Sequence, residues 1–374
     1  MSGEPLTVAL TVEQCWQPVP GGSGTYVREL TTALAGRDDV RVIGLAARHA
    51  EQGLPGGRLA VPVRSSGLPR IGLYEAWSRL RRPSAEHICG PVDVVHASTW
   101  ALPGHGAPLV ATVHDLAFLR EPAHFTARGN RFFRRALDLV VAEAAAVVVP
   151  SRATADDLVR YGLDEARVHV VPHGVRAGAV AVGEVEGWRS RNGIGERYVL
   201  WCGTLEPRKN LPRLVRAFVQ ARAQGMDAEL VLAGPQGWGA ASDDVGRALR
   251  ALPDGVVHLT GRLDDHELQV AYHGATAFAF PSLWEGFGMP VLEAMAHGVP
   301  VLTSVGTSMA EFAEGAGELA DPLDVDALAT GLLAVTGDDR PDRAAVAAQA
   351  GRFTWEQSAA AHVRAYRAAL AGGR

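Results

Sequence analysis

The sequence predicts an α/β protein made of two doubly wound domains, each with a parallel sheet. Short apolar runs such as LTVALTVE, VDVVHAS and AAAVVVPS alternate with longer amphipathic stretches. The runs are continuously apolar, which is typical of parallel strands covered on both faces. The same alternation starts again at YVLWCGTLE. A second sheet of the same kind is therefore expected.

The length of 374 residues is sufficient for two hydrophobic cores. We expect a first domain over residues 1–175, a linker region over 176–198 and a second domain over 199–351. The linker region is rich in glycine and poor in apolar periodicity. The alanine-rich end, 352–374, has apolar residues at helical spacing, with Thr354 as a possible N-cap.

Composition narrows the classes of protein to consider. No stretch approaches the ~20 apolar residues that span a bilayer, and the start lacks the basic leader and apolar run of a signal peptide. We therefore expect a cytoplasmic enzyme. The net charge of -5 disfavours nucleic acid as a partner. Three widely spaced cysteines disfavour both a disulfide framework and a zinc site. They are Cys15, Cys89 and Cys202.

The first strand is followed by a glycine-rich turn, PGGSG, that opens the first helix. Gly22 and Gly24 in this turn would let the backbone approach a ligand closely. The spacing does not match GxGxxG, and the next strand, VRVIGLAARH, ends without the acidic residue that holds a ribose. A dinucleotide-dependent oxidoreductase is thereby disfavoured. A plain strand-to-helix turn is an equally good interpretation.

The segment VATVHDL places His114 and Asp115 at the end of a strand. The histidine could bond a sugar hydroxyl while Asp115 holds its ring, although a structural histidine is the commoner case. In the same half, Tyr74, Trp77 and Trp100 could stack on an acceptor sugar or pack in the core.

Two arginine clusters in the first half could meet an anionic lipid acceptor. A solvated face is the simpler interpretation. The clusters are Arg79, Arg81, Arg82 and Arg128, Arg131, Arg134, Arg135.

Lys209 is the only lysine among 36 basic residues. In a chain that otherwise uses arginine, a single lysine suggests a place where a compact ammonium is needed. Together with Arg208 it follows the strand YVLWC, and open α/β sheets bind ligands at the carboxyl ends of their strands. Two fixed cations there could offset the charge on a departing nucleotide diphosphate. Seen alone, a basic pair is usually a surface feature.

The segment EGFGMPVLEAMAHG predicts a short helix over residues 290–297. Pro290 suits the first turn of a helix, and Gly298 suits its end. The preceding EGFGM loop would lie at the positive end of the helix, where backbone amides of residues 287–289 can point at a phosphate.

Two glutamates flank this loop. Glu293, one turn into the helix, could accept hydrogen bonds from a ribose diol. Glu285, before the loop, is better placed to face a sugar.

These motifs, in this order, resemble the retaining glycosyltransferases of family four. The resemblance covers almost the whole chain and rests on GGSGTYVREL, VATVHDLAFLREP, VVPSRATADDLVRYG, GTLEPRKNLPRLVRAF and PSLWEGFGMPVLEAMAHGVPV. The HDL and EPRKN variants are most similar to mannosyltransferase-type members. The family implies a GT-B fold, in which two Rossmann-like domains face each other across a cleft and the terminal helix returns to the first domain.

The resemblance implies a role for each matching residue. Arg208 and Lys209 would contact the diphosphate, Glu293 the ribose, Glu285 the donor-sugar hydroxyls, and His114 the sugar from the opposite domain. The implied catalytic residues are Glu285, His114, Arg208 and Lys209. The implied donor-binding residues are Gly22, Gly24, Gly203, Arg208, Lys209, Arg262, Leu263, Glu285, Phe287, Gly288, Met289 and Glu293, with Arg262 and Leu263 near the nucleobase.

The family's chemistry is the transfer of a hexose from a nucleotide diphosphate sugar to a hydroxyl, with retention and without a metal or other cofactor. GDP-mannose is the leading donor, ahead of UDP- and dTDP-sugars. Glycan, lipid and small-molecule acceptors all stay open, and a lipid acceptor would bring the enzyme into peripheral contact with the inner face of a membrane. A catalytically silent sugar-nucleotide-binding subunit is the main alternative, and the oxidoreductase is a weaker one.

Overall fold

The computed structural model describes residues 4–17, 21–49, 57–235 and 255–372. The chain divides into two compact units, each built around one parallel sheet. The first unit comprises Met1–Gly174 and Thr354–Arg374, and the second comprises Val175–Phe353. The prediction of two doubly wound α/β domains is confirmed.

The first unit has a described sheet of seven parallel strands in the order β3-β2-β1-β4-β5-β6-β7. The strands are β1 (Leu6–Thr11), β2 (Val40–Ala46), β3 (Val63–Ser65), β4 (Val94–Ala97), β5 (Leu109–Thr112), β6 (Ala144–Val149) and β7 (Val168–Val170). Val8 of β1 pairs with Val42 on one side and with Val94 on the other. The strand order therefore reverses between β1 and β4, the topological switch point where such sheets bind ligands.

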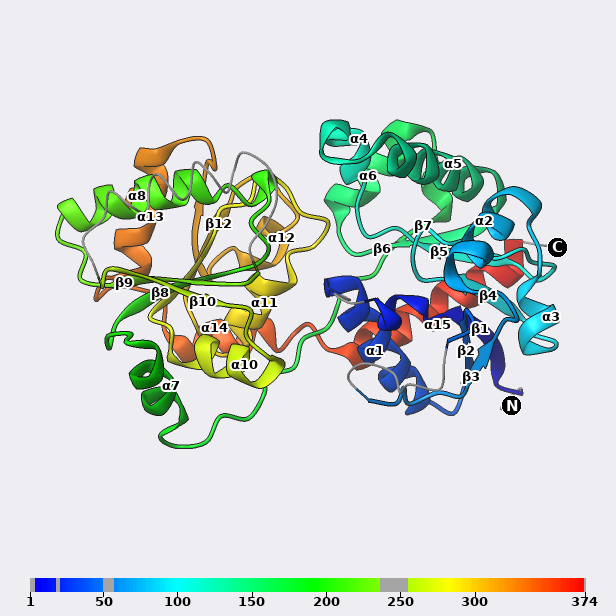
Figure 1. Cartoon of the computed structure of the whole chain (residues 1–374), viewed down its shortest axis with the longest axis horizontal. Coiled ribbons are helices and arrows are strands. Elements are labelled where there is room, and N and C mark those ends of the chain that lie inside the picture. Colours follow the sequence, from blue (N-terminus) through cyan, green and yellow to red (C-terminus); the bar gives the residue numbers. More distant parts are fainter. Residues whose placement is uncertain (1–3, 18–20, 50–56, 236–254, 373–374) are drawn as a thin grey trace. The chain divides into compact units, whose positions relative to one another are not determined.

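Helices cover both faces of the first sheet (Figure 1), because crossovers that run in opposite directions from the switch point lie on opposite faces. The helices are η1 (Glu13–Trp16), α1 (Gly21–Ala35), α2 (Arg70–Leu80), α3 (Ala85–Cys89), α4 (Ala117–Arg120), η2 (Pro122–His124), α5 (Ala127–Glu143), α6 (Arg152–Tyr161) and η3 (Glu165–Arg167). Ser151 caps α6 by accepting from the Thr154 amide.

The last helix, α15 (Trp355–Gly372), packs on the first unit, where it contacts α1 and the strands β4, β5 and β6. In Figure 1 its red ribbon lies beside α1. Thr354 accepts from the Gln357 amide at the start of α15, which is the expected N-cap bond. Residues 373–374 of the expected terminal segment lie outside the described residues.

A chain of buried polar groups joins α15 to the sheet. His362 of α15 contacts the Tyr26 hydroxyl at 2.8 Å, and Tyr26 contacts the Thr112 hydroxyl at 2.8 Å. Thr112 contacts His96 Nε2 at 2.7 Å, and His96 Nδ1 contacts the Tyr366 hydroxyl at 2.9 Å. The chain thus begins and ends on α15 and satisfies every polar side chain it passes.

The second unit repeats this topology with six described strands in the order β10-β9-β8-β11-β12-β13. The strands are β8 (Tyr198–Cys202), β9 (Glu229–Ala233), β10 (Val257–Gly261), β11 (Ala277–Phe280), β12 (Val301–Ser304) and β13 (Gly317–Ala320). The helices are α7 (Glu184–Asn192), η4 (Pro207–Lys209), α8 (Leu211–Ala223), α10 (Asp265–Gly274), α11 (Met289–Ala296), α12 (Ala310–Ala313), α13 (Val325–Thr336) and α14 (Arg343–Ala350). Its switch point lies between β8 and β11.

Residues 176–198, the expected linker region, belong instead to the second unit. They contain α7, which contacts α10, and Trp188 of α7 is fully buried. The apolar pattern of α7 is weak because this helix buries one large ring rather than a continuous stripe. The chain passes between the units at residues 174–175 and 353–354.

Candidate functional site

Lys209 ends η4, in the loop that follows β8. Its side chain is buried, and Nζ donates to Oε1 of Glu285 at 2.7 Å. The ammonium also lies 4.6 Å from the centre of the ring of Phe280, the last residue of β11. An anion and an aromatic face therefore hold the lysine at the switch point between β8 and β11.

Arg208 binds the other oxygen of the same carboxylate. Its Nη1 lies 2.6 Å from Glu285 Oε2, and its Nε donates to Glu206 Oε2 at 2.9 Å. The guanidinium lies 5.3 Å from the centre of the Trp284 ring, and the Arg208 carbonyl accepts from the Leu283 amide at 2.8 Å. The loops after β8 and β11 are thus joined by both side-chain and backbone contacts.

The cluster contains two cations, Arg208 and Lys209, and two carboxylates, Glu206 and Glu285, so its charges cancel. Burial by itself would raise the pKa of the Glu285 carboxyl, but Lys209 and Arg208 outweigh burial and lower that pKa to about 2. Burial lowers the pKa of Lys209, and Glu285 opposes the change. An ammonium has three N–H donors and a guanidinium has five. Each cation can therefore keep its bond to Glu285 and still donate to a phosphate oxygen.

The EGFGM loop leads into α11, which begins at Met289, within one residue of the predicted start. Gly288 is its N-cap, with φ of 97°. A β-carbon at this position would collide with the Met309 side chain, so glycine is required for both reasons. Ser308 fixes the loop by donating to the carbonyls of Glu285 at 2.8 Å and Phe287 at 3.1 Å.

Glu293 lies on α11, and its Oε2 accepts from the Tyr272 hydroxyl at 3.0 Å. Burial raises the pKa of Glu293, and the bond from Tyr272 opposes that rise. The Tyr272 oxygen also lies 3.0 Å from Cys202 Sγ at the end of β8. Because the tyrosine proton points to the carboxylate, the thiol donates to the tyrosine oxygen. Cys202 thus proves to be a buried residue that supports the site.

The remaining predicted donor-site residues of the second unit lie after β8 and after β10. Gly203 follows β8 with φ of 151°, a conformation that favours glycine, and its amide donates to the Ala233 carbonyl at 2.9 Å. Arg262 is exposed and Leu263 is half-buried, both just after β10. In the sheet order, β10 is two strands away from β8.

In the first unit, His114 follows β5, and its Nε2 donates to the Ser98 carbonyl at 2.9 Å. Burial lowers the pKa of His114, so the ring is neutral. Because the Ser98 carbonyl can only accept, the proton lies on Nε2, and Nδ1 is left as an acceptor. Asp115, which could have held the ring, instead accepts from the amide of Ala117, the first residue of α4, at 3.0 Å. The carbonyl of Ser98, not the neighbouring carboxylate, orients the histidine.

Gly22 and Gly24 lie in the first turn of α1 rather than in a loop before it. Gly22 is exposed and Gly24 is buried. The helix begins immediately at the glycine run because the residues that follow carry the apolar face of α1. The amino-terminal end of α1 follows β1 and η1 in the chain and thus lies at the carboxyl edge of the first sheet.

Sequence reasoning missed three residues that shape the candidate site. Glu206 neutralises Arg208, Tyr272 orients Glu293, and Ser308 holds the EGFGM loop. Glu206 could have been found, since it lies inside the GTLEPRKN motif. Tyr272 and Ser308 lie in other segments, and only the fold brings them to the site.

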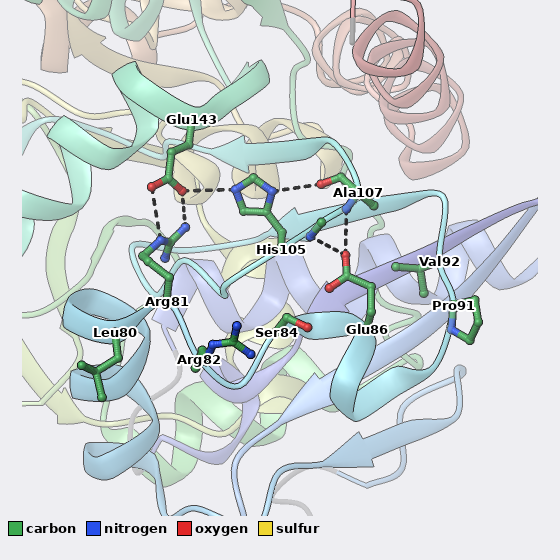
Figure 2. A pocket seen from close by; sticks show the side chains of 11 residues that line it. Leu80, Arg81, Arg82, Ser84, Glu86, Pro91, Val92, His105, Ala107 and Glu143 are labelled. Carbon is green, nitrogen blue, oxygen red and sulfur yellow. Dashed lines mark hydrogen bonds and ion pairs between the residues drawn. The ribbon is translucent and has the colours of Figure 1, made fainter. Parts of the chain in front are cut away.

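A cavity of about 1130 Å³ lies in the first unit beside residues that precede β4, β5 and β6 (Figure 2). It is therefore at the amino edge of the sheet, opposite the edge where ligands bind. Glu143 forms an ion pair with Arg81 and lies 3.1 Å from His105 Nε2. Arg81 of the arginine clusters is thus internally paired, and Arg128 is paired with Glu75 at 2.9 Å.

The chain contains one Asp-x-Asp sequence, Asp324-Val325-Asp326. Such pairs can hold a metal ion beside a diphosphate. Here Asp324 is the N-cap of α13, and its side chain accepts from the amides of Asp326 and Ala327. In the part of the chain that the structure describes, no group of three or more His, Cys, Asp or Glu residues could hold a metal ion.

Two family descriptions match the chain. Residues 20–178 match "Glycosyltransferase Family 4", and residues 196–338 match "Glycosyl transferases group 1".

Curated relatives are similar over different lengths. An O-antigen chain mannosyltransferase B from Escherichia coli is 40% identical over 176 residues, which cover 46% of this chain and 45% of that protein. This chain thus spans less than half of that relative. A D-inositol 3-phosphate glycosyltransferase from Geodermatophilus obscurus is 32% identical over 322 residues, covering 77% of this chain and 69% of that protein.

Solved structures share the fold. A sucrose-phosphate synthase from Thermosynechococcus elongatus has a TM-score of 0.73 at 21% identity, over 97% of this chain and 98% of that one. The Anabaena protein HepE in complex with UDP-glucose has a TM-score of 0.72 at 20% identity, over 96% of this chain and 99% of that one. Among the described residues, no helix is long and apolar enough to cross a membrane.

Proposed function

Because this chain belongs to glycosyltransferase family four and is an enzyme that transfers sugars, we propose that it moves a hexose, with mannose favoured, from a nucleotide diphosphate sugar to a hydroxyl acceptor. The proposal includes retention at the anomeric carbon, no need for a metal ion, and a cytoplasmic location. The mannosyltransferase relative supports mannose, and GDP-mannose is accordingly the leading donor. The HepE complex supports a nucleotide sugar as the class of donor. An oxidoreductase is excluded by family membership.

One observation carries the proposal. The cations of Arg208 and Lys209 are held on a single carboxylate at the switch point of the second sheet. As the bond between the sugar and the phosphate breaks, negative charge grows on the phosphate oxygen. Cations that are already fixed in a buried place stabilise that charge without having to reorganise. Glu293 would hold the ribose, and the amides at the start of α11 would hold the phosphates.

The Glu285 carboxylate supports a front-face mechanism. A carboxyl with a pKa of about 2 is ionised at neutral pH and is too weak a base to deprotonate a hydroxyl efficiently. The acceptor proton would pass to the leaving phosphate oxygen, which gains the electron pair of the breaking bond. The acceptor oxygen would form the new bond on the same face of the sugar. Glu285 would hold the cations and contact donor-sugar hydroxyls, with His114 on the acceptor side.

The first test is a thermal-shift and hydrolysis screen with GDP-mannose, GDP, UDP-glucose, UDP, dTDP-glucose and NAD, in the presence of EDTA. A ligand that binds only the folded state raises its melting temperature. We expect stabilisation by GDP-mannose and GDP, and hydrolysis that EDTA does not abolish. Stabilisation by UDP-glucose and UDP, or by dTDP-glucose, would reassign the donor. Loss of all activity in EDTA, restored by Mg²⁺ or Mn²⁺, would disprove metal independence.

A further inference from the structure

The first unit contains a cavity of about 340 Å³ at its switch point. Its lining comes from the segments after β1, β4 and β5, together with α2, α4 and α5. His114 is part of the lining, so the cavity adjoins the residue expected to contact the sugar. Six aromatic side chains form much of its wall. They are Tyr74, Trp100, Phe118, Phe125, Phe132 and Phe133.

These rings form a connected wall, and most of them are only half-buried. Trp100 meets Phe118 edge-on with 5.4 Å between ring centres, and Tyr74 lies along Phe132 at 6.4 Å. The neighbouring Trp77 behaves differently, because it is fully buried and its Nε1 donates to the Pro83 carbonyl at 2.9 Å. Core packing accounts for Trp77. It leaves the half-buried faces of Tyr74 and Trp100 without an explanation.

The polar groups of the cavity are mostly uncharged. Gln17 and Thr99 line it, and the Gln17 side-chain oxygen accepts from Arg70, a cation that is not itself part of the lining. Asp115 contributes a carboxylate, and His114 contributes a neutral ring. Among the described lining residues there is no lysine or arginine. A carboxylate in the wall repels a phosphate group and tolerates a hydroxyl.

We propose that this cavity binds the acceptor through an uncharged pyranose unit and discriminates against phosphorylated acceptors. A pyranose has an apolar face of C–H groups, which suits the aromatic wall, and an edge of hydroxyls, which suits Gln17, Thr99 and the His114 Nδ1 acceptor. The transfer of sugar to that unit rests on the function proposed above. Binding of the sugar in the cavity does not depend on that function.

The size of the cavity sets what it can hold. Ligand pockets commonly measure about 300–1,000 Å³, and this one is near the lower limit. It therefore suits one or two sugar rings, while the rest of a longer acceptor would extend outside. A long lipid chain would not fit, so a lipid-linked acceptor would enter by its sugar end.

Binding can be tested without turnover by saturation-transfer NMR on the full chain. The neutral ligands are the methyl glycosides of mannose, glucose, galactose and rhamnose, and myo-inositol. The charged ligands are mannose 6-phosphate and inositol 3-phosphate, and n-octyl α-mannoside tests for an apolar chain. We expect at least one neutral methyl glycoside to bind about tenfold more tightly than mannose 6-phosphate. Equal or tighter binding of the phosphates, or binding of the octyl compound alone, would overturn the proposal, as would binding of no neutral sugar.

Variants locate the binding. Trp100→Ala should weaken binding of the neutral glycoside about tenfold, and Trp100→Phe should restore most of it. Asp115→Asn should narrow the gap between mannose and mannose 6-phosphate about three- to tenfold. Trp16→Ala is the matched control, because Trp16 is a half-buried ring of the same unit that stacks on His49 outside the cavity. If Trp16→Ala and Trp100→Ala weaken binding equally, the cavity is not the site.

The two proposals fail separately. GDP binding, measured by thermal shift, depends on the second unit and should be unchanged in Trp100→Ala. If no nucleotide sugar binds the wild-type chain, the proposed function fails while the NMR result on the cavity stands. If nucleotide binding and turnover are normal and the acceptor KM of Trp100→Ala equals that of the wild type, the cavity proposal fails alone.

Discussion

In the first unit a chain of buried neutral rings and hydroxyls joins α15 to the sheet, whereas in the second unit buried charges are in contact at the switch point. The two sheets share the same core strand order around the switch point, so topology does not explain the difference. The neutral chain of the first unit fastens α15 in place. The ion pairs of the second unit hold two cations where a diphosphate would bind. The same fold thus anchors a helix with buried polar groups in one unit, and in the other unit it holds the cations that we propose act on the donor.

The neutral chain has a single consistent arrangement of protons. His362 Nδ1 must donate to the Ser358 carbonyl, so its Nε2 accepts from Tyr26. Tyr26 then accepts from Thr112, Thr112 accepts from His96 Nε2, and His96 Nδ1 accepts from the last hydroxyl of the chain. One carbonyl fixes the direction of the whole chain. A proton added to either histidine would break it.

The ion pairs are the contrasting case, because we propose that their cations stabilise negative charge on the donor phosphate. Substituting Lys209 by alanine should reduce turnover about 10²- to 10³-fold, since one fixed cation at the leaving group is lost. The first unit should keep its stability. Steady-state kinetics and hydrogen exchange measure the two effects. Lys209→Arg keeps the charge but not the compact ammonium, and should recover only part of the rate.

Arg216→Ala is the matched control, because Arg216 is an exposed cation on the neighbouring helix α8. Its turnover should match that of the wild type. Near-normal turnover of Lys209→Ala would remove the assignment of Lys209 to the leaving group.

The free energy of unfolding should depend more strongly on pH in the first unit than in the second, where burial lowers the pKa of His297 to about 4. Burial lowers the pKa of each of five histidines in the first unit, and that of His362 falls to about 4. Unfolding returns these rings to their ordinary pKa of about 6.5, so below pH 6.5 the unfolded state binds more protons. The free energy of unfolding should therefore fall as the pH drops from 6.5 toward 4, by on the order of 3 kcal/mol for His362 alone. The other four are His96, His114, His169 and His173.

Glu285 makes stability fall with pH in the same direction as the histidines, but in a lower pH window. Its pKa is lowered to about 2, so its contribution is complete above the ordinary value of 4.5 and is lost only as the pH falls below that value. Hydrogen exchange of peptides from α15 and α11, compared between pH 7.5 and 4.8, distinguishes the units. Protection of α15 should decrease more than that of α11, because five histidines of the first unit have a lowered pKa and the end of α11 carries one, His297. Equal loss in both helices would contradict the comparison.

A single hydroxyl tests the neutral chain directly. Tyr26→Phe leaves Thr112 and His362 with unpaired buried atoms and should cost about 1–3 kcal/mol of unfolding free energy. Tyr198→Phe in the second unit removes only one bond, to the Ala271 carbonyl, and should cost about 1 kcal/mol. Urea titrations that are monitored by hydrogen exchange assign each loss of unfolding free energy to its unit. Equal losses of unfolding free energy would show that the chain of neutral buried groups stabilises the protein no more than a single hydrogen bond does.

The smallest expected effect concerns the caps of matched helices. Thr354→Ala removes the N-cap of α15, where the chain re-enters the first unit, and should cost about 1 kcal/mol. Asp264→Ala removes the capping box of α10 in the second unit and should cost a similar amount. Thermal melts report both. A much larger loss at Thr354 would indicate that docking of α15, beyond its cap, had failed.

Much of this molecule could be predicted from local patterns. Continuously apolar runs separated by amphipathic stretches indicated two parallel sheets, and the isolated lysine together with the EGFGM loop indicated a donor-phosphate site. Pro290 and Gly298 placed α11 to within one residue. The sheets and the helix are confirmed, because periodicity, capping and glycine preferences depend on a few neighbouring residues, whereas the donor-phosphate site stays a prediction.

The tertiary structure decided what depends on contacts between distant segments. Strand order places the loop after β8 beside the loop after β11, and this brings one carboxylate onto both cations. It also places Tyr272 against Glu293, assigns the expected linker to the second unit, and separates Trp77 in the core from Trp100 in the cavity. Sequence spacing carries no information on these choices, because burial and partner are set by packing between elements that are far apart in the chain.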